Sequence, residues 1–369
     1  MTLRTCLLLV GLGLLWALGV INCRLNVNFQ QASEDRRLSV PPVAGSGLEV
    51  RTAFGGISVV ADSGVTNVEI IAKINAGGET LEEAKTNLSR VLVKTERRSE
   101  QVLAIWMEAP KLSRFGAGCS FEVRVPEAKG IKARTSNGAI HLQGLGGAVD
   151  AETSFGSVTV RKQRGPVTLR SSNGAISAEQ IAGSVKANTS FGHITARDVE
   201  GKVDATTSNG GIEVVKAGDA VQATTAFGTV TIRDVAGKTA VRNSNGAIKI
   251  EKIRGDVTAS TSFGSVEARE VTGAADLSSL NGTLTYAPAK GNENTFQLTA
   301  TFGAVTVYLP SSAKGTIKAA TSFGNIQVDG PRKPISVTGE KEQKQIVLTD
   351  SGGVSEIRTS NGAIRVHLE

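Results

Sequence analysis

Apolar and polar residues alternate along most of this chain, in short runs separated by turns that contain glycine. Residues 157 to 161 read Ser-Val-Thr-Val-Arg, and residues 166 to 170 read Pro-Val-Thr-Leu-Arg. This two-residue period is typical of a strand with one buried face. Because residues 131 to 287 show no helical period, the pattern predicts an all-β fold built from short, half-buried strands.

The strands belong to a repeated unit of about 18 residues. The second residue after the first glycine of each unit is apolar, from Ile140 to Leu284, and most units carry a second glycine further along. A single small unit repeated in this way predicts one β-solenoid, that is, a β-helix. The unit is marked by an X-Gly dipeptide in which X alternates between asparagine and phenylalanine: Asn137, Phe155, Asn173, Phe191, Asn209, Phe227, Asn245, Phe263 and Asn281.

These Asn and Phe positions are interpreted as structural turn and core residues. Asn-Gly pairs are typical of tight turns that need positive φ. The residue four before each repeat Phe is always small, as at Ala151, whereas the residue four before Asn is often larger, as at Leu169. This exchange of volume predicts that the Phe side chains point inward and fill the core. An exposed aromatic row that binds a ligand is the alternative.

Charged residues distinguish a coil of about 18 residues from one of about 36 residues. Stacked coils lie about 4.8 Å apart, so outward residues in one column become cross-strand neighbours, where unlike charges are favourable. The shorter coil stacks arginine mostly on glutamate, whereas the longer coil stacks arginine on arginine. We therefore prefer the shorter coil, although the longer one would give continuous Phe and Asn stacks; a right-handed coil is expected for a parallel crossover. The column forms a candidate surface ladder of Arg161, Glu179, Arg197, Arg233, Glu251 and Arg269.

The regular repeats, residues 131–287, have different neighbours at their two ends. Residues 48–130 carry less regular strands and one short helix that begins at the capping-box sequence Thr80 to Glu83, which predicts a cap over the first edge of the solenoid. Residues 25–47 are expected to form a linker. Residues 288–369 are expected to form irregular C-terminal coils, because the spacing lengthens and loops rich in Pro, Gly, Lys and Glu intervene.

Residues 1–24 are expected to form an export signal or a membrane anchor. Thr5 to Asn22 is an uncharged and mostly apolar run between Arg4 and Arg24, long enough to span a membrane and longer than most signal-peptide cores. A retained anchor, lipidation at Cys23 and ordinary cleavage are three alternatives that the sequence leaves open. Each predicts an extracytoplasmic protein that is membrane-anchored, periplasmic or at the cell surface.

Composition favours a binding module over an enzyme. The 369 residues include 42 glycines and only 4% aromatic residues, which suits a thin, repetitive core. The net charge of +7 is well mixed along the chain, and it favours weak attraction to an anionic envelope polymer or lipid headgroups as much as plain solvation of a β surface. A nucleic-acid partner is not expected, because basic runs interleaved with aromatic residues are missing.

Residues that could support chemistry are sparse. His141, His193 and His367 do not have the spacing of metal ligands, and Cys119 is expected to be buried and unreactive. With Cys23 as the other cysteine outside the apolar run, no disulfide framework is expected. Carboxylates that share an outward column, such as Asp150, lie two or more coils from the next one, which is too far for paired acid-base catalysis. We predict no catalytic residue, metal or cofactor.

A column of hydroxyl residues stands two positions before the Asn and Phe residues. A flat row of threonines could suggest an ice-binding face, but Asn243 and charged neighbours interrupt the row. We therefore expect these side chains to hydrogen-bond the backbone of the turns. The column contains Thr153, Ser171, Thr189, Thr207, Thr225 and Thr261.

The recurring strings resemble those of a known bacterial family. Thr-Ser-Phe-Gly-Ser-Val at 153 to 158, Ser-Ser-Asn-Gly-Ala-Ile at 171 to 176 and Thr-Ser-Asn-Gly-Ala-Ile at 359 to 364 are similar to the β-strand repeats of DUF4097 proteins, which are regarded as candidate adhesins. The resemblance covers about residues 48 to 369 and implies a cell-envelope protein with a β-solenoid ectodomain. Export, stacked repeats and sparse chemistry lead us to expect a non-enzymatic protein whose rigid surface binds a polymer or another protein. A scaffold or sensor arm in envelope-stress signalling is the alternative, and a carbohydrate-active enzyme is a weaker third.

Overall fold

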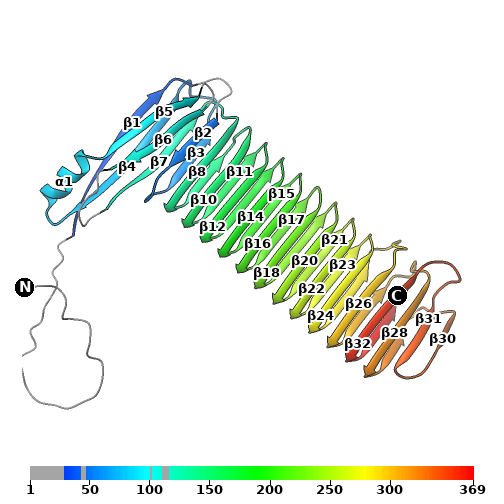
Figure 1. Ribbon diagram of the computed structural model, residues 1–369. Helices are drawn as coiled ribbons and strands as arrows, with labels where there is room; N and C mark the ends of the chain where they lie inside the picture. The colour runs from blue at the N-terminus through cyan, green and yellow to red at the C-terminus, as the bar shows by residue number, and fades with distance from the viewer. Residues whose placement is uncertain (1–28, 43–46, 100–101, 110–115) are drawn as a thin grey trace, which may run out of the picture.

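The computed structural model describes residues 29–42, 47–99, 102–109 and 116–369, and it is an elongated stack of flat coils with a β-rich cap at one end (Figure 1). Each regular coil contributes one strand to each of two sheets. Val149 pairs with Val167 in one sheet, and Val158 pairs with Ile176 in the other. The partners in both pairs stand one repeat unit apart in the sequence, so the predicted all-β solenoid with the shorter coil is confirmed.

The first sheet is mainly parallel and has 16 strands. Their spatial order is β1 (Gln30–Val40), β4 (Val68–Gly78), β7 (Ala117–Val125), β3 (Ile57–Ala61), β9 (Ile140–Gln143), β11 (Val158–Gln163), β13 (Ile176–Ile181), β15 (Ile194–Val199), β17 (Ile212–Ala217), β19 (Val230–Val235), β21 (Ile248–Ile253), β23 (Val266–Val271), β25 (Leu284–Pro288), β27 (Val305–Leu309), β33 (Ile364–Leu368) and β29 (Ile326–Asp329).

The second sheet faces the first one. Its strands pair in the order β5 (Leu92–Ser99), β6 (Val102–Glu108), β2 (Gly47–Arg51), β8 (Gly130–Asn137), β10 (Ala148–Phe155), β12 (Val167–Asn173), β14 (Val185–Phe191), β16 (Val203–Asn209), β18 (Val221–Phe227), β20 (Thr239–Asn245), β22 (Val257–Phe263), β24 (Ala275–Asn281), β26 (Phe296–Phe302), β32 (Val354–Asn361), β28 (Thr316–Phe323), β31 (Gln343–Val347) and β30 (Ser336–Thr338).

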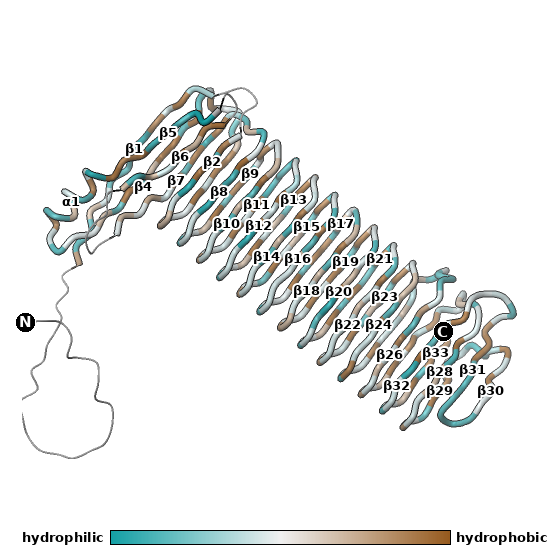
Figure 2. Tube along the Cα trace, viewed as in Figure 1, coloured by the Kyte–Doolittle hydropathy of each residue, from teal (hydrophilic) through white to brown (hydrophobic). Residues whose placement is uncertain are grey.

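The core lies between the two sheets. Alternate residues of each strand point inward, and those of one coil, Val158, Val160, Val167 and Leu169, are at most 2% exposed. Hydrophobic residues recur at the same place in successive coils, as the brown bands of Figure 2 show. Since most of these side chains are Val, Ile, Leu or Ala, the core is one thin layer continued along the stack.

The cap extends both sheets beyond the first coil. The predicted helix is present as α1 (Leu81–Ser89), where the hydroxyl of Thr80 accepts a hydrogen bond from the Glu83 N–H, and it packs against β4 and β1. Residues 30–40, which we expected to lie in a linker, instead form β1 and pair with β4 along its whole length. The linker prediction was wrong here because β1 is an edge strand. Most of its residues are exposed and polar, so its pattern is weak.

The first coil of the solenoid lies inside the region predicted to be the cap. Strands β2 and β3 pair in parallel with β8 and β9, and the turn between β2 and β3 contains Phe54 and Gly55. The last coils depart from chain order. Strand β32, near the C-terminus, lies between β26 and β28, and β33 lies between β27 and β29.

Candidate functional site

The two turn edges of the solenoid have opposite character. At one edge each coil passes from the second sheet to the first through a segment of the type Thr-Ser-Phe-Gly-Ser or Ser-Ser-Asn-Gly-Ala. These segments contain no Asp, Glu, Lys or Arg in any coil, from residues 52–56 to residues 359–363. At the opposite edge the turn at residues 143–148 is uncharged, but every later turn from residues 161–166 to residues 269–274 carries charged residues. An uncharged edge is unusual for a chain with 20% charged residues.

The uncharged edge presents a row of phenylalanines to solvent. Phe54, Phe155, Phe191, Phe227, Phe263, Phe302 and Phe323 are 52% to 74% exposed. Our expectation that the repeat Phe residues fill the core was therefore wrong. The inward place next to the turn belongs to the hydroxyl residue two positions earlier, for example Thr153, which is 2% exposed. The strand ladder then skips Ser154, and the bend that leads into Gly156 directs Phe155 outward.

Asparagine and phenylalanine alternate along this row from one end of the stack to the other. We call the row the Phe/Asn ridge. In spatial order it reads Phe54, Asn137, Phe155, Asn173, Phe191, Asn209, Phe227, Asn245, Phe263, Asn281, Phe302, Asn361 and Phe323. Twelve steps of about 4.8 Å give the ridge a length of roughly 58 Å.

Glycine and hydroxyl residues hold the backbone of the ridge. A side chain on Gly174 would place its Cβ 1.9 Å from the carbonyl oxygen of Gly156 in the neighbouring coil, so the turns stack too closely for any other residue. The Thr207 hydroxyl donates a hydrogen bond to the carbonyl of Gly192, at 3.1 Å. The same bond recurs along the ridge, and Asn243 makes it with its amide. The predicted hydroxyl ladder is confirmed.

Positive φ occurs at both turn edges, but on different residue types. Among the described residues, those with positive φ other than glycine lie at the charged edge, with φ between 51° and 63°: Lys162, Gln180, Asp198, Lys216, Asp234, Lys252 and Glu270. The ridge asparagines are not among them; in the Asn-Gly pairs a positive φ falls on the glycine, as at Gly246 with φ 147° and Gly282 with φ 157°. The ridge turns use glycine for the unusual conformation, as at Gly228 with φ 137°.

The candidate surface ladder lies along the charged edge. Arg161 and Glu179 are register partners and form an ion pair at 3.1 Å, as do Arg233 and Glu251. Arg197 pairs instead with Glu213 of the next strand, β17. Arg269 pairs with Glu267 of its own strand, β23. These pairs are largely exposed, and exposed pairs contribute little to stability. All six charged side chains of the ladder are thus paired.

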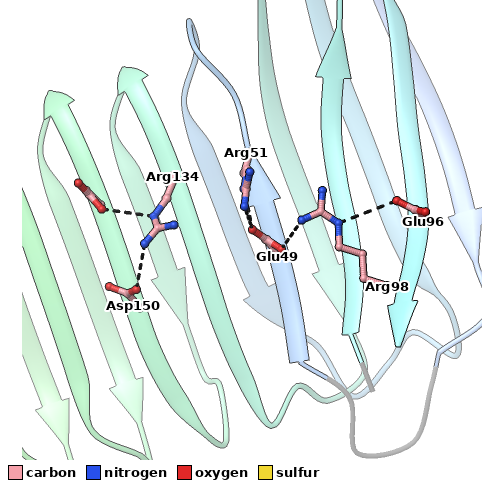
Figure 3. A network of polar contacts seen from close by, with 7 residues as sticks. Glu49, Arg51, Glu96, Arg98, Arg134 and Asp150 are labelled. Atoms are coloured by element: carbon pink, nitrogen blue, oxygen red, sulfur yellow. Dashed lines mark hydrogen bonds and ion pairs between the residues drawn. The ribbon is translucent and has the colours of Figure 1, made fainter. Parts of the chain in front are cut away.

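A second charged network joins the cap to the first coils (Figure 3). Glu49 of β2 is 9% exposed and accepts hydrogen bonds from Arg51 at 2.6 Å and from Arg98 of β5 at 3.1 Å. The Arg98 guanidinium also lies over the Trp106 ring, 5.4 Å from its centroid. Arg98 also lies 3.9 Å from Glu96, so the two arginines of this network are matched by two glutamates and link β5 to β2.

The described residues contain no group of His, Cys, Asp or Glu that could hold a metal ion. Burial raises the pKa of the Cys119 thiol to about 12, which keeps it protonated and unreactive at neutral pH. Cys119 is also one of the residues that line a mostly apolar hollow of about 410 Å³, with Phe29 and Phe54. His141 and His193 stand on separate coils, and His367 contacts Asp329 at 2.6 Å. Asp150 contacts Arg134 and Arg170, and Glu152 shares the Arg134 guanidinium with it.

The predicted leader and its lipidation site lie outside the described residues. Residues 1–24, with Cys23, fall in the first undescribed stretch. Within the described part of the chain, none of the helices is both long and apolar enough to cross a membrane.

Comparison with known proteins gives a family match and distant structural likeness. The family model described as Toastrack DUF4097 matches residues 59–367, and no curated protein matches the chain. A candidate cell adhesion protein from Clostridium sporogenes is 11% identical, with 92% of this chain and 100% of that chain covered and a TM-score of 0.19. A candidate adhesin from Parabacteroides distasonis is 9% identical, with 91% and 97% covered and a TM-score of 0.27. A candidate lipid-binding protein from the same species is 11% identical, with 90% and 96% covered and a TM-score of 0.27.

Proposed function

This chain belongs to the Toastrack DUF4097 family, and from that premise we propose that it is a non-enzymatic binding protein whose stiff solenoid presents the Phe/Asn ridge to a partner at the cell envelope. The observation that carries the proposal is the row of seven exposed phenylalanines on an edge without charge. Exposed apolar side chains are unfavourable in water, and large exposed apolar patches mark interaction sites. A partner that covers these rings would explain why they are exposed.

The size of the ridge supports a binding role. A phenylalanine buries about 150 to 250 Å² when it is fully covered. Since each ridge Phe is more than half exposed, the seven side chains offer roughly 700 Å² of apolar surface. This sum, distributed over the length of the ridge, is close to the ~800 Å² that one partner contributes to an ordinary protein interface.

An extracytoplasmic location is part of the proposal. It rests on the apolar run Thr5 to Asn22 between two arginines, which would direct the chain to the envelope. Protease accessibility of a tagged chain in intact cells tests it: a chain that is degraded only after the cells are broken and their cytoplasm is released would contradict this location.

The experiment for the binding role uses the full chain on beads and washed bacterial envelope fragments. We expect the beads to retain the fragments and a variant with Phe191→Asn and Phe227→Asn to retain far fewer. Asparagine occupies the same turn position in the neighbouring coils, so this variant should fold. Retention that is equal for both proteins, or absent for both, would contradict a binding role for the ridge.

A further inference from the structure

The alternation along the ridge is not required by the core. Both the Phe and the Asn side chains project from the turn, and the inward column four residues earlier does not follow their alternation. Ala205 stands in an Asn coil, and Leu298 stands in a Phe coil. A core that demanded the alternation would pair small residues with Phe throughout. The two-coil period of the ridge therefore belongs to its outer surface.

The alternation also survives where the chain order of the coils changes. Strand β32 enters between β26 and β28, and this places Asn361 between Phe302 and Phe323. The residues follow each other in space as Phe, Asn, Phe, although their order in the sequence is Phe302, Phe323, Asn361. A simple duplication of a two-coil unit would not produce this arrangement, so the spatial period itself is the property to explain.

The chemistry of one period suits a neutral ligand with two kinds of contact. The exposed ring of a Phe offers an apolar plate, and one coil further the Asn amide both donates and accepts hydrogen bonds. Serine side chains such as Ser190 and Ser208 flank these positions and are exposed. Since the ridge segments carry no charged side chain, they offer no counter-charge to a phosphate, a carboxylate or an anionic lipid headgroup.

We propose that the Phe/Asn ridge binds one chain of a neutral, extended β-1,4-linked polysaccharide along its length. This inference rests on the proposed binding function and names its ligand class. In such a glycan each sugar is turned by half a rotation relative to its neighbour, so every second sugar presents the same face. The Phe plates recur every two coils, about 9.6 Å, which is close to the length of an extended disaccharide.

In this arrangement the C–H face of every second sugar packs on a phenylalanine ring through dispersion contacts. The sugars between them face the Asn amides, which pair with hydroxyl groups. Each contact is weak by itself. Because the plates stand on one rigid scaffold with the period of the ligand, successive contacts form at a high effective concentration and their free energies accumulate.

The test measures depletion of the full chain from solution by insoluble cellulose and by chitin, which are neutral β-1,4-linked glycans. We expect at least one of them to retain the chain. Soluble oligosaccharides of the same linkage should release it, and the concentration needed for release should fall with each disaccharide unit added to the oligosaccharide. Starch is the matched polymer control, because its α-1,4 linkage makes the chain coil. The double variant Phe191→Asn and Phe227→Asn should bind at least tenfold more weakly, whereas Ile335→Ala, which alters an exposed apolar residue away from the ridge, should bind normally.

A composition-preserving variant tests the period directly. Asn209→Phe combined with Phe227→Asn keeps the number of plates and moves one plate by a single coil. We expect this variant to bind at least fivefold more weakly, and unchanged binding would overturn the proposal. Far-ultraviolet circular dichroism establishes that each variant is folded.

Three other results would also overturn the proposal. The first is lack of retention on both β-1,4-linked polymers. The second is ridge-dependent self-association in sedimentation velocity, which would identify a second copy as the occupant. The third is ridge-dependent binding to vesicles of neutral phospholipid. If envelope fragments are still retained through the ridge while both glycans are ignored, the proposed binding function stands and only this ligand assignment fails.

Discussion

Replacing Thr207 by valine removes one hydrogen bond of the hydroxyl ladder. The Thr207 side chain is 3% exposed, and its hydroxyl donates to the Gly192 carbonyl at 3.1 Å. Valine has nearly the same shape, so the change removes the donor without leaving a cavity. A buried hydrogen bond contributes about 0.5 to 1.5 kcal/mol, and a buried carbonyl deprived of its donor costs about 1 to 3 kcal/mol. We expect the free energy of unfolding to fall by about 1 to 2 kcal/mol.

The same strand provides the control, and a neighbouring coil provides the rescue. Thr206 points outward and is exposed, so Thr206→Val should change the free energy of unfolding by less than about 0.5 kcal/mol. Thr207→Asn should recover most of the loss, because Asn243 makes the corresponding bond to Gly228 at 2.8 Å. Urea unfolding followed by circular dichroism measures all three variants. Equal effects of the two valine substitutions, or no rescue by asparagine, would refute the view that this bond stabilises the turn.

Three further substitutions test other parts of the architecture by the same unfolding measurement. Gly192→Ala should destabilise the chain by about 3 kcal/mol, because the new Cβ would lie 2.1 Å from the Gly174 carbonyl oxygen; a neutral effect would mean that the coils can separate freely. Lys252→Val should lower the free energy of unfolding by about 1 to 2 kcal/mol, since a β-branched residue fits poorly at φ 59°. The control Lys249→Val, on the outward face of β21, should leave the free energy of unfolding unchanged. Equal losses of stability in the two variants would contradict this reason. Tyr286→Phe should raise the free energy of unfolding by about 1 to 3 kcal/mol. The Tyr286 hydroxyl is buried without a partner among the described residues, and burial raises its pKa. A destabilised variant would contradict this and indicate a hydrogen bond to the hydroxyl.

The solenoid could be predicted because its determinants are periodic in the sequence. Stacking brings residues one repeat unit apart into one column, so the alternation of Arg161 with Glu179 already indicates the length of the coil. The hydroxyl column was predictable for a similar reason. Thr207 recurs at a fixed distance from a glycine, and a buried hydroxyl must find an acceptor. The helix α1 followed from a local signal, its capping sequence at Thr80.

The candidate site could not be predicted in the same way because it depends on how the chain bends at the turn. Strand alternation places Phe155 on the inward face, two residues after Thr153, yet the ladder skips Ser154 and the side chain emerges into solvent. Small residues such as Ala151 suggested space for the ring in the core, but the ring lies outside it. The exposed member at Phe54 was also missed, because it is separated from the regular repeats by the whole cap. The lack of charge around every Asn-Gly and Phe-Gly pair was the signal that could have revealed the site.

The exchanged order of the last coils has a consequence for biogenesis. Strands β26 and β28 do not pair with each other, because β32 lies between them. Until the ribosome has made residues 354–368, the native arrangement of these two strands lacks the strand that fills the space of about 9.6 Å between them. The far end of the rod therefore closes last, through contacts distant in sequence, which are slow to form. A nascent or truncated chain that lacks this segment exposes two unpaired edges, and such edges promote aggregation.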